Sequence, residues 1–400
     1  MSVFTLTESA PHRARGAIVL AYGFRPFFLA TAGWAIVTLS LWMLALAGLT
    51  PTWLAIDLAW HQHEMIFGVF GAAIAGFLLT AIPEWAKVAP LTGWPLALLV
   101  GLWFAGRGVM ILGIDGVASA LVAAAFLPCV AAIGARSLIT QRPPRLGLLI
   151  SLIGILGVLE GGWQAGRIGL LAIEPTFIAL PSLAILAALI TLVSGRIIIV
   201  VSQFALIAEQ STRQLRAEPA STEIAAWLLL LLAGVLLLDV QSPIVGWIAF
   251  AAAAAQIHRL CEWWIGLAMR QSYVWPLHAG SLMIAIACTA IGFDGLGSSL
   301  SLSLIAHTFG VGASALVTLA VMTIAGLRHT GHDLVIPRLA TAALVCVAMA
   351  TLLRTIPPIH DTYFRIMLGL SAALWIAAFA LYLASVGPAL LRPRIDGKIG

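Results

Sequence analysis

The sequence has 400 residues, of which 62% are hydrophobic and only 9% are charged, and its mean hydropathy is +1.06. This composition excludes a soluble globular domain, because such a domain needs a polar surface toward water. The net charge of +5 does not indicate a nucleic-acid partner, since the basic residues are spread through short loops between apolar runs.

Apolar runs of about 20 residues follow one another along the chain, and each matches the thickness of the hydrocarbon core of a bilayer. Backbone groups in lipid must be paired within the structure, so continuous runs predict helices, whereas a barrel needs alternating runs. We therefore predict an all-α integral membrane protein, a bundle of about twelve transmembrane helices. The predicted spans are residues 27–48, 60–82, 94–113, 117–138, 146–163, 176–202, 223–238, 244–268, 274–293, 300–326, 338–355 and 363–386.

The loop charges predict how the bundle is oriented. Terminal segments 1–26 and 387–400 flank a single predicted membrane domain, residues 27–386. Most Lys and Arg residues fall in these two segments and in the loops after even-numbered spans, and short loops rich in positive charge stay in the cytoplasm. Both termini are therefore predicted to be cytoplasmic. Arg167 and Arg354 are exceptions, because they follow odd-numbered spans.

Three histidines are predicted to lie near the outer face. His61 and His63 open the second span, and His307 lies about 7 residues into the tenth, which a helical rise of 1.5 Å per residue places about 10 Å deep. Arg107 and Glu160 fall in the same outer zone. Ionisable side chains at membrane depth are costly and mark function, and imidazole is the commonest metal ligand. We therefore predict metal ligands among these histidines.

The spacing of His61 and His63 leaves two alternatives. Positions two apart on an α-helix point about 200° away from each other, so both rings cannot face one metal from a regular helix. Either the first turn is distorted, or each histidine has a different partner. His61 shares its stripe with Glu64 and Gly68, which suits a tight helix interface, whereas the His63 stripe is aromatic and could face lipid or a flat cofactor.

A second layer of ionisable residues is predicted in the inner half of the membrane. His258, about 14 residues into the eighth span, and His278, near the start of the ninth, are expected at similar depth because these spans are antiparallel neighbours. Arg196 and Arg259 occupy the same half, and His329 ends the tenth span. Functional roles are favoured for the deep histidines, and hydrogen bonding to a neighbouring helix is the alternative.

Several sequence blocks resemble those of one bacterial family. Tyr22–Phe28 (YGFRPFF) leads into the first span, Trp60–Gly68 (WHQHEMIFG) opens the second, and both blocks are specific. Further blocks extend the resemblance through nearly the whole chain: Gly76–Pro83, Leu91–Pro95, Gly195–Ile198, His307–Thr308, Val321–Thr323 and His329–Gly331. On these residues the chain resembles the NnrS family. It departs from the family pattern in Ile199–Phe204, which lacks the usual Pro and Arg-Asn pair, and at Arg328 and His332, which flank His329–Gly331.

The resemblance implies a multi-pass protein of the bacterial inner membrane that contains haem b and copper. It also implies a role in nitric oxide metabolism or resistance to nitrosative stress, often linked to denitrification. Nitric oxide or a related small redox ligand is then the expected partner, with an electron donor that the sequence does not identify. If the protein is an enzyme, it acts on nitric oxide or a related nitrogen oxide, and no catalytic residue is predicted.

The resemblance also leads us to assign the two layers to the two cofactors. The inner layer is expected to bind haem through His258 or His278, with Arg196 and Arg259 toward the haem propionates. The outer layer is expected to bind copper, which imidazole suits. The outer ligands are His61, His63 and His307, the reverse assignment stays open, and His329 is a further candidate metal ligand.

Two other classes of function remain open on the sequence. Twelve helices with intramembrane His, Arg and Glu residues also describe a secondary transporter with a substrate or proton site, although no repeat symmetry is evident. The second alternative is a non-catalytic sensor or accessory subunit that binds haem without turnover.

Overall fold

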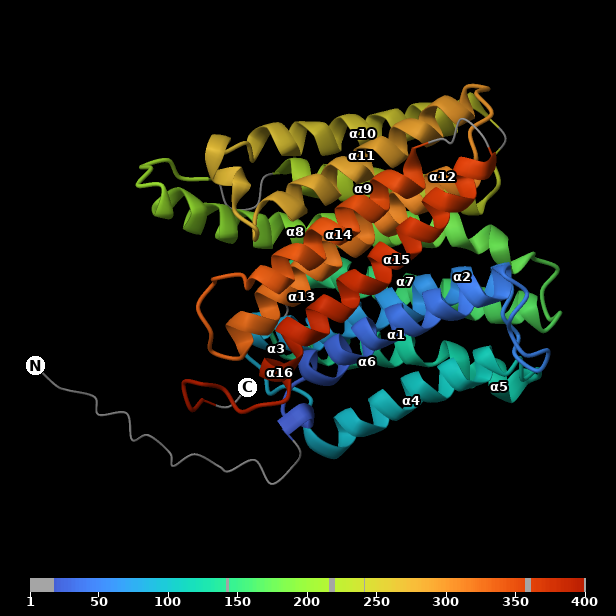
Figure 1. The fold of residues 1–400 in the computed structure, drawn as a ribbon, viewed down its shortest axis with the longest axis horizontal. Coiled ribbons are helices and arrows are strands. Elements are labelled where there is room, and N and C mark those ends of the chain that lie inside the picture. The colour runs from blue at the N-terminus through green and yellow to red at the C-terminus, as the bar shows by residue number, and fades with distance from the viewer. Residues whose placement is uncertain (1–17, 142–143, 216–219, 241, 357–360, 399–400) are drawn as a thin grey trace, which may run out of the picture.

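The computed structural model describes residues 18–398 apart from 142–143, 216–219, 241 and 357–360. Within these ranges the chain is helical and no strand is present, and the long helices lie side by side along the longest axis of the molecule (Figure 1). The elements are η1 (Ile18–Leu20), α1 (Phe24–Leu46), α2 (Leu58–His63), η2 (Glu64–Phe70), α3 (Gly71–Ala86), α4 (Gly93–Ile111), α5 (Val117–Ala124), α6 (Phe126–Gln141), α7 (Pro144–Arg167), η3 (Pro175–Ile178), α8 (Ala179–Ala208), α9 (Ala220–Leu237), α10 (Pro243–Glu262), η4 (Gly266–Arg270), α11 (Trp275–Gly295), α12 (Leu302–His307), η5 (Thr308–Ala315), α13 (Leu316–His329), α14 (Arg338–Thr355), α15 (Asp361–Ser385) and α16 (Gly387–Leu390).

The number of membrane-length helices agrees with the sequence prediction. Among the described residues, 11 helices are long and apolar enough to span a bilayer, and the bent pair Val117–Ala124 and Phe126–Arg136 makes up to 12 if it counts as one span. The 44° bend precedes Pro128, which has no N–H to continue the helical ladder. The predicted all-α bundle of about twelve spans is confirmed. The cytoplasmic placement of the termini and the segment boundaries stay predictions, and residues 1–17 lie outside the described part of the chain.

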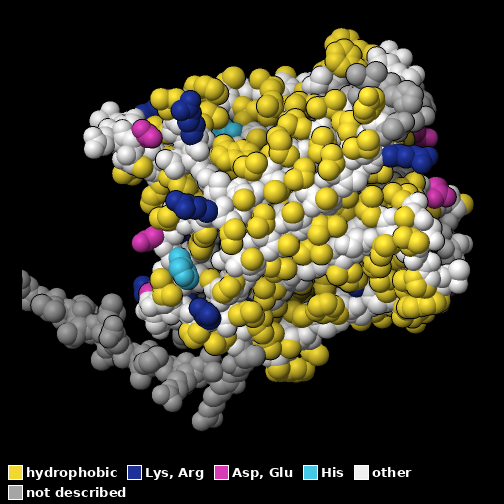
Figure 2. Space-filling view, viewed as in Figure 1, with side chains coloured by type: hydrophobic (Ala, Val, Ile, Leu, Met, Phe, Trp, Pro, Cys, Tyr) yellow, Lys and Arg dark blue, Asp and Glu magenta, His cyan; other side chains and the backbone are white. Residues whose placement is uncertain are grey.

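The outer surface of the bundle is apolar along its middle. Large hydrophobic side chains are exposed on most of the long helices, for example Val158, Val200 and Trp247. Figure 2 shows a broad hydrophobic face, with charged side chains gathered at its two ends and more Lys and Arg at the end where α16 lies. This pattern is that of a bundle whose middle faces acyl chains.

Two spans form the centre of the bundle, and each is interrupted by a π-helical segment. One runs from Leu58 to Ala86 through η2, and the other from Leu302 to His329 through η5. In both, 83% of the most apolar window is buried, against 33% for α1. A π-helical turn takes up extra backbone and is frequent at functional sites. The outer histidines lie at or just before these two segments.

Glycines allow α1 to pack closely on α3 at one end of the bundle. A Cβ atom at Gly76 would lie 2.8 Å from the Phe28 ring, and one at Gly23 would lie 2.7 Å from Leu79 Cβ. The Phe24 amide donates to Thr80 Oγ1 at 3.1 Å across this contact. The first block that resembles the family therefore packs directly against the third.

The first helix is also joined to the end of the chain. Arg25, in the first turn of α1, is fully buried, and its Nη1 donates to the carbonyls of Leu390 at 2.7 Å and Arg392 at 2.8 Å. These carbonyls belong to α16 and the segment after it, which lie beside the start of α1 (Figure 1). The guanidinium thereby finds uncharged acceptors in the protein interior.

Candidate functional site

A row of aromatic rings joins α1, α2 and α12 near one end of the bundle. Asp57 caps α2, since its side chain accepts from the Trp60 amide at 2.7 Å, and this fixes the turn that carries His61. The His61 ring stacks on Trp42 with centroids 4.8 Å apart and planes at 12°. On its other side, the His307 ring centroid lies 6.4 Å away with planes at 22°. The structure therefore brings His61 and His307 together.

Both imidazoles of this pair keep a ring nitrogen that the protein does not bind. Nδ1 of His61 is buried and has no hydrogen-bond partner. Nδ1 of His307 lies 2.6 Å from the Ser303 carbonyl, so this nitrogen carries the proton and Nε2 keeps its lone pair. Arg354 Nη2 donates to the hydroxyl of the same serine at 2.7 Å, which places a positive charge beside the pair.

His63 belongs to a separate group, the buried ionic cluster, formed by His63, Glu64, Arg107, Glu160 and Gln164. All five side chains are at most 1% exposed. The Glu64 carboxylate accepts from Trp34 Nε1 at 2.6 Å, faces His63 Nδ1 at 2.9 Å, and pairs with Arg107 Nη1 at 3.2 Å. Gln164 Nε2 lies 3.0 Å from His63 Nε2 and donates to it, since Nδ1 carries the ring proton toward Glu64. Both ring nitrogens of His63 are thus engaged.

Glu160 is the member of the buried ionic cluster with the weakest partners. Its Oε1 lies 3.5 Å from His63 Nε2 and 3.6 Å from Arg107 Nη2. These separations are too long for good hydrogen bonds, and neither carboxylate oxygen has a hydrogen-bond partner. A buried carboxylate without hydrogen bonds is costly. Glu160 is therefore the point in the cluster where an additional ligand or proton is most readily accommodated.

The cluster is connected to the surface through α7. The Gln164 amide oxygen accepts from Arg167 Nε at 2.8 Å, and Arg167 Nη1 pairs with the exposed Asp115 at 2.6 Å. Arg167 is one of the two residues that break the predicted alternation of loop charges, and Arg354 is the other. The structure explains both exceptions. The guanidinium of Arg167 lies beside the buried ionic cluster, and that of Arg354 lies beside the pair of His61 and His307.

A glycine makes room for the buried ionic cluster. A Cβ atom at Gly68 would lie 2.8 Å from Arg107 Nη1, 2.8 Å from Glu64 Oε2 and 3.0 Å from Trp34 Nε1. The carbonyl of Gly68 also accepts from Trp103 Nε1 at 3.2 Å. The expected tight interface on this stripe is confirmed, and it is an interface with charged groups rather than with apolar ones.

The spacing of His61 and His63 is resolved in favour of different partners. The π-helical segment begins at Glu64, after both histidines, so the turn that carries them is α-helical and their rings diverge. The aromatic stripe of His63 faces the interior, where the His63 and Phe67 rings contact Trp163. It does not face lipid, because Phe67 is only 1% exposed.

In the half of the bundle predicted to be inner, the side chain of His258 lies on an exposed face of its helix. Its side chain is 66% exposed, and Nε2 pairs with Glu262 at 3.5 Å, one turn along the same helix. The expectation that His258 lies in the bundle interior is wrong, because helical rise gives depth but not the face of the helix. His278 is buried, and each of its ring nitrogens lies 3.2 Å from a backbone carbonyl, that of Val274 or Trp263.

The inner arginines have protein partners rather than open positions. Arg259 is fully buried, bonds the Thr191 carbonyl at 3.0 Å and the Gln256 amide oxygen, and lies 4.3 Å from the Trp263 ring. Arg196 lies 4.6 Å from the Trp85 ring. His329 Nδ1 pairs with Glu84 at 3.2 Å at the end of α13. These side chains do not fit a haem held in the bundle interior by His258 or His278, because the His258 side chain is exposed and both ring nitrogens of His278 lie against backbone carbonyls.

The ring nitrogens of the outer pair, His61 and His307, suit a metal better than those of the inner histidines do. Within the described ranges, no group of three or more His, Cys, Asp or Glu side chains is spaced to hold a metal ion. The expected set of His61, His63 and His307 is therefore reduced to His61 and His307, because the nitrogens of His63 are already engaged. Two neutral imidazoles with available lone pairs are a donor set that copper accepts.

Fold and site together define a multi-pass helical membrane protein with a histidine pair between its two central spans and a buried ionic cluster between the first of these spans, α4 and α7. The profile of the family described as NnrS protein matches residues 18–394, nearly the whole chain. The chain therefore belongs to the NnrS family. A comparison with curated proteins finds no match for it.

Proposed function

We propose that this chain is a copper-binding membrane protein of nitric oxide metabolism, with His61 and His307 as metal ligands. The observation that carries the proposal is the buried, unpartnered Nδ1 of His61 in a ring 6.4 Å from that of His307. Family membership supports the choice of copper among the metals that imidazole binds, and it supports nitric oxide as the ligand. Copper bound at the pair would supply one-electron exchange and a coordination position for a small ligand.

The surrounding residues prepare the pair for this role. Trp42 holds the plane of the His61 ring, and the Ser303 carbonyl fixes the tautomer of His307 so that Nε2 is the available nitrogen. Arg354, bonded to the same serine, disfavours additional positive charge and so favours a singly charged metal or an anionic ligand. Nitric oxide is apolar and partitions into lipid, so it needs no polar path to this site.

The buried ionic cluster lies directly beside the pair in sequence and contains two carboxylates and one guanidinium. Arg107 is the one cation that faces both carboxylates, Glu64 and Glu160. Buried ions stabilise one another when their geometry is good. The bonds of Glu64 to Arg107 and of His63 to Gln164 tie the end of α2, the helix that carries His61, to α4 and α7 without occupying either free nitrogen of the pair.

The decisive experiment is metal analysis of the detergent-purified protein after reconstitution with copper. We expect bound copper in the wild type and its loss in His61→Ala and in His307→Ala. The exposed His258→Ala is the matched control and should keep the metal. Copper retained in both outer variants would overturn the ligand assignment.

A second measurement tests the link to nitric oxide. Addition of nitric oxide to the copper-loaded wild type should change the electron paramagnetic resonance or optical spectrum of the metal, and the change should be absent in His307→Ala. Copper binding without any response to nitric oxide would retain the metal site and reject the proposed ligand. Gradient-driven uptake of a solute into proteoliposomes by the metal-free protein would favour a transporter instead.

The proposed function routes no step through the haem that membership of the NnrS family suggests. His258 is exposed and both nitrogens of His278 face carbonyls, so no step of the proposed function depends on a haem at these positions.

A further inference from the structure

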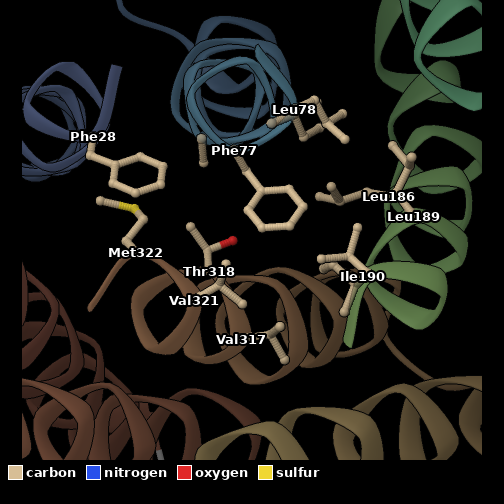
Figure 3. A pocket seen from close by; sticks show the side chains of 13 residues that line it. Phe28, Phe77, Leu78, Leu186, Leu189, Ile190, Val317, Thr318, Val321 and Met322 are labelled. Atoms are coloured by element: carbon tan, nitrogen blue, oxygen red, sulfur yellow. The ribbon is translucent and has the colours of Figure 1, made fainter. Parts of the chain in front are cut away.

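A small cavity lies among α1, α3, α8 and α13, away from both outer groups (Figure 3). Its volume is about 60 Å³, several times the roughly 10–15 Å³ that a single water molecule requires. Of the 13 side chains that line it, 12 are hydrocarbon or thioether groups, and the hydroxyl of Thr318 is the one polar group. A cavity with so few polar partners does not hold water stably.

The position of the cavity in the bundle is central. Phe77 on α3, Ile190 on α8 and Val321 on α13 point into it from three spans (Figure 3). Each of these residues lies well inside its span, between 15 and 20 residues after the residue that begins it. The cavity is therefore near mid-membrane, where the surroundings are hydrocarbon.

Two of the lining helices continue directly into the histidine pair. His61 precedes Ala73 by 12 residues on one central span, and His307 precedes Val317 by 10 residues on the other. At 1.5 Å per residue these separations are about 15–18 Å along the helices. A molecule in the cavity is therefore too far away to touch the histidine pair. It nevertheless lies between the same two spans that carry His61 and His307.

The cavity is incompletely closed. Ile74, Phe77, Val193 and Thr318 all keep partial exposure, whereas Phe28, Leu78 and Leu186 are buried. Small apolar molecules concentrate in the hydrocarbon core, so an opening at this depth admits them directly from lipid.

We propose that this cavity is a docking site for a small apolar gas molecule, which waits there between the bilayer and the histidine pair. The volume admits a diatomic molecule and is too small for an acyl chain, and the lining contains no charged group to bind an ion. The identity of the gas as nitric oxide rests on the proposed function. The existence of the docking site rests only on the shape and lining of the cavity.

Xenon is the probe that tests the cavity directly, because it is apolar and binds dry cavities. Crystals of the full-length protein under xenon pressure should show anomalous density between Phe77, Ile190 and Val321. Val321→Phe fills the cavity and should abolish this density, whereas Phe77→Ala enlarges it and should increase the occupancy. Val158→Phe, a change of the same kind at a side chain that is 74% exposed, is the control and should leave the density unchanged.

The outcomes separate this inference from the proposed function. Absence of xenon from the wild type, or equal xenon in Val321→Phe, overturns the docking site whatever the metal content. If xenon binds as expected, the rate at which nitric oxide reaches the copper-loaded protein should be lower in Val321→Phe than in Val158→Phe, with the same amount bound at saturation. An equal rate in the two variants would show that the cavity is off the path of nitric oxide and would overturn its proposed role, while loss of copper in His61→Ala would be unaffected.

Discussion

The two halves of this bundle, which the loop charges predict to be the outer and the inner one, both bury arginine and imidazole, but they provide different partners for them. In the outer half, Arg107 faces two buried carboxylates, and Glu160 has no hydrogen bond to either oxygen. In the inner half, Arg259 is bonded to Thr191, Thr222 and Gln256, and His278 faces backbone carbonyls. The inner groups are satisfied by neutral atoms, whereas the outer groups depend on one another's charge.

This difference distinguishes charged side chains that are buried for stability from those that are buried for function. A guanidinium held by hydroxyls and carbonyls does not need a charged partner to remain in place. A cluster of mutually dependent ions next to an unpartnered imidazole responds to any added metal, ligand or proton. Depth in the membrane alone does not distinguish the two cases, and the partners of each group do.

The strongest test of the comparison is removal of the cation that both outer carboxylates share. Arg107→Ala leaves Glu64 and Glu160 without it, and we expect the free energy of unfolding to fall by about 3–5 kcal/mol. Glu262→Gln is the inner control. Its side chain is 35% exposed, so the change should be below about 1 kcal/mol. Denaturant unfolding in detergent micelles measures both, and equal effects would contradict the distinction.

Steric crowding of the buried ionic cluster should have the next largest effect. Gly68→Ala introduces a Cβ atom 2.8 Å from both Arg107 Nη1 and Glu64 Oε2, and we expect a loss of about 1–3 kcal/mol in stability. Gly101→Ala is the matched control, because its added Cβ meets nothing within 4 Å. That change should be neutral or stabilising by up to about 1 kcal/mol. A stable Gly68→Ala would show that the cluster is loosely packed.

The two inner histidines should differ from each other. His278→Ala removes the ring that contacts the Trp263 carbonyl and should lower stability by about 1 kcal/mol. His258→Ala should change it by no more than about 0.5 kcal/mol, since the side chain is exposed. Neither variant should lose copper. Copper loss from either variant would contradict the distinction between a metal-binding outer half and a structural inner half.

An exposed ion pair gives the smallest expected effect. The Arg394 guanidinium holds the pKa of the Asp396 carboxyl below its ordinary value. The pair therefore contributes above that ordinary pKa, and its contribution is lost as the pH falls through the lowered one. Asp396→Asn should slightly increase hydrogen exchange in residues 391–398 at neutral pH and have no effect in strong acid. An increase in hydrogen exchange that becomes larger toward acid pH would contradict the predicted direction of this pH dependence.

The fold was predictable because hydropathy reports directly on the bilayer. Span lengths and the all-α class follow from the runs themselves, whereas the central position of the second and tenth spans is known only from their burial in the structure. The bend before Pro128 and the two π-helical segments were not predicted, because they depend on how neighbouring helices pack. The resemblance to the NnrS family was readable from the first two sequence blocks, and it covers the chain.

The residues of the site were predictable from the sequence, but their contacts were not. His61, His307, Arg107 and Glu160 were expected in one outer zone, and the structure divides them between two adjacent groups. The exposure of His258 could not be inferred from the rise of a helix. The missed partner Gln164 carries no charge and gives no signal in a hydropathy profile. Arg354 and Arg167 did give one, since both broke the pattern of loop charges.

The contact between Arg25 and residues 390–392 has a consequence for biogenesis. The guanidinium of Arg25, at the start of α1, bonds carbonyls of residues that follow it by 365 and 367 positions along the chain. Until those residues have been synthesised, these two hydrogen bonds cannot form, so this junction between α1 and α16 closes late. Deletion of residues 389–400 should therefore leave the start of α1 less firmly held and more sensitive to protease.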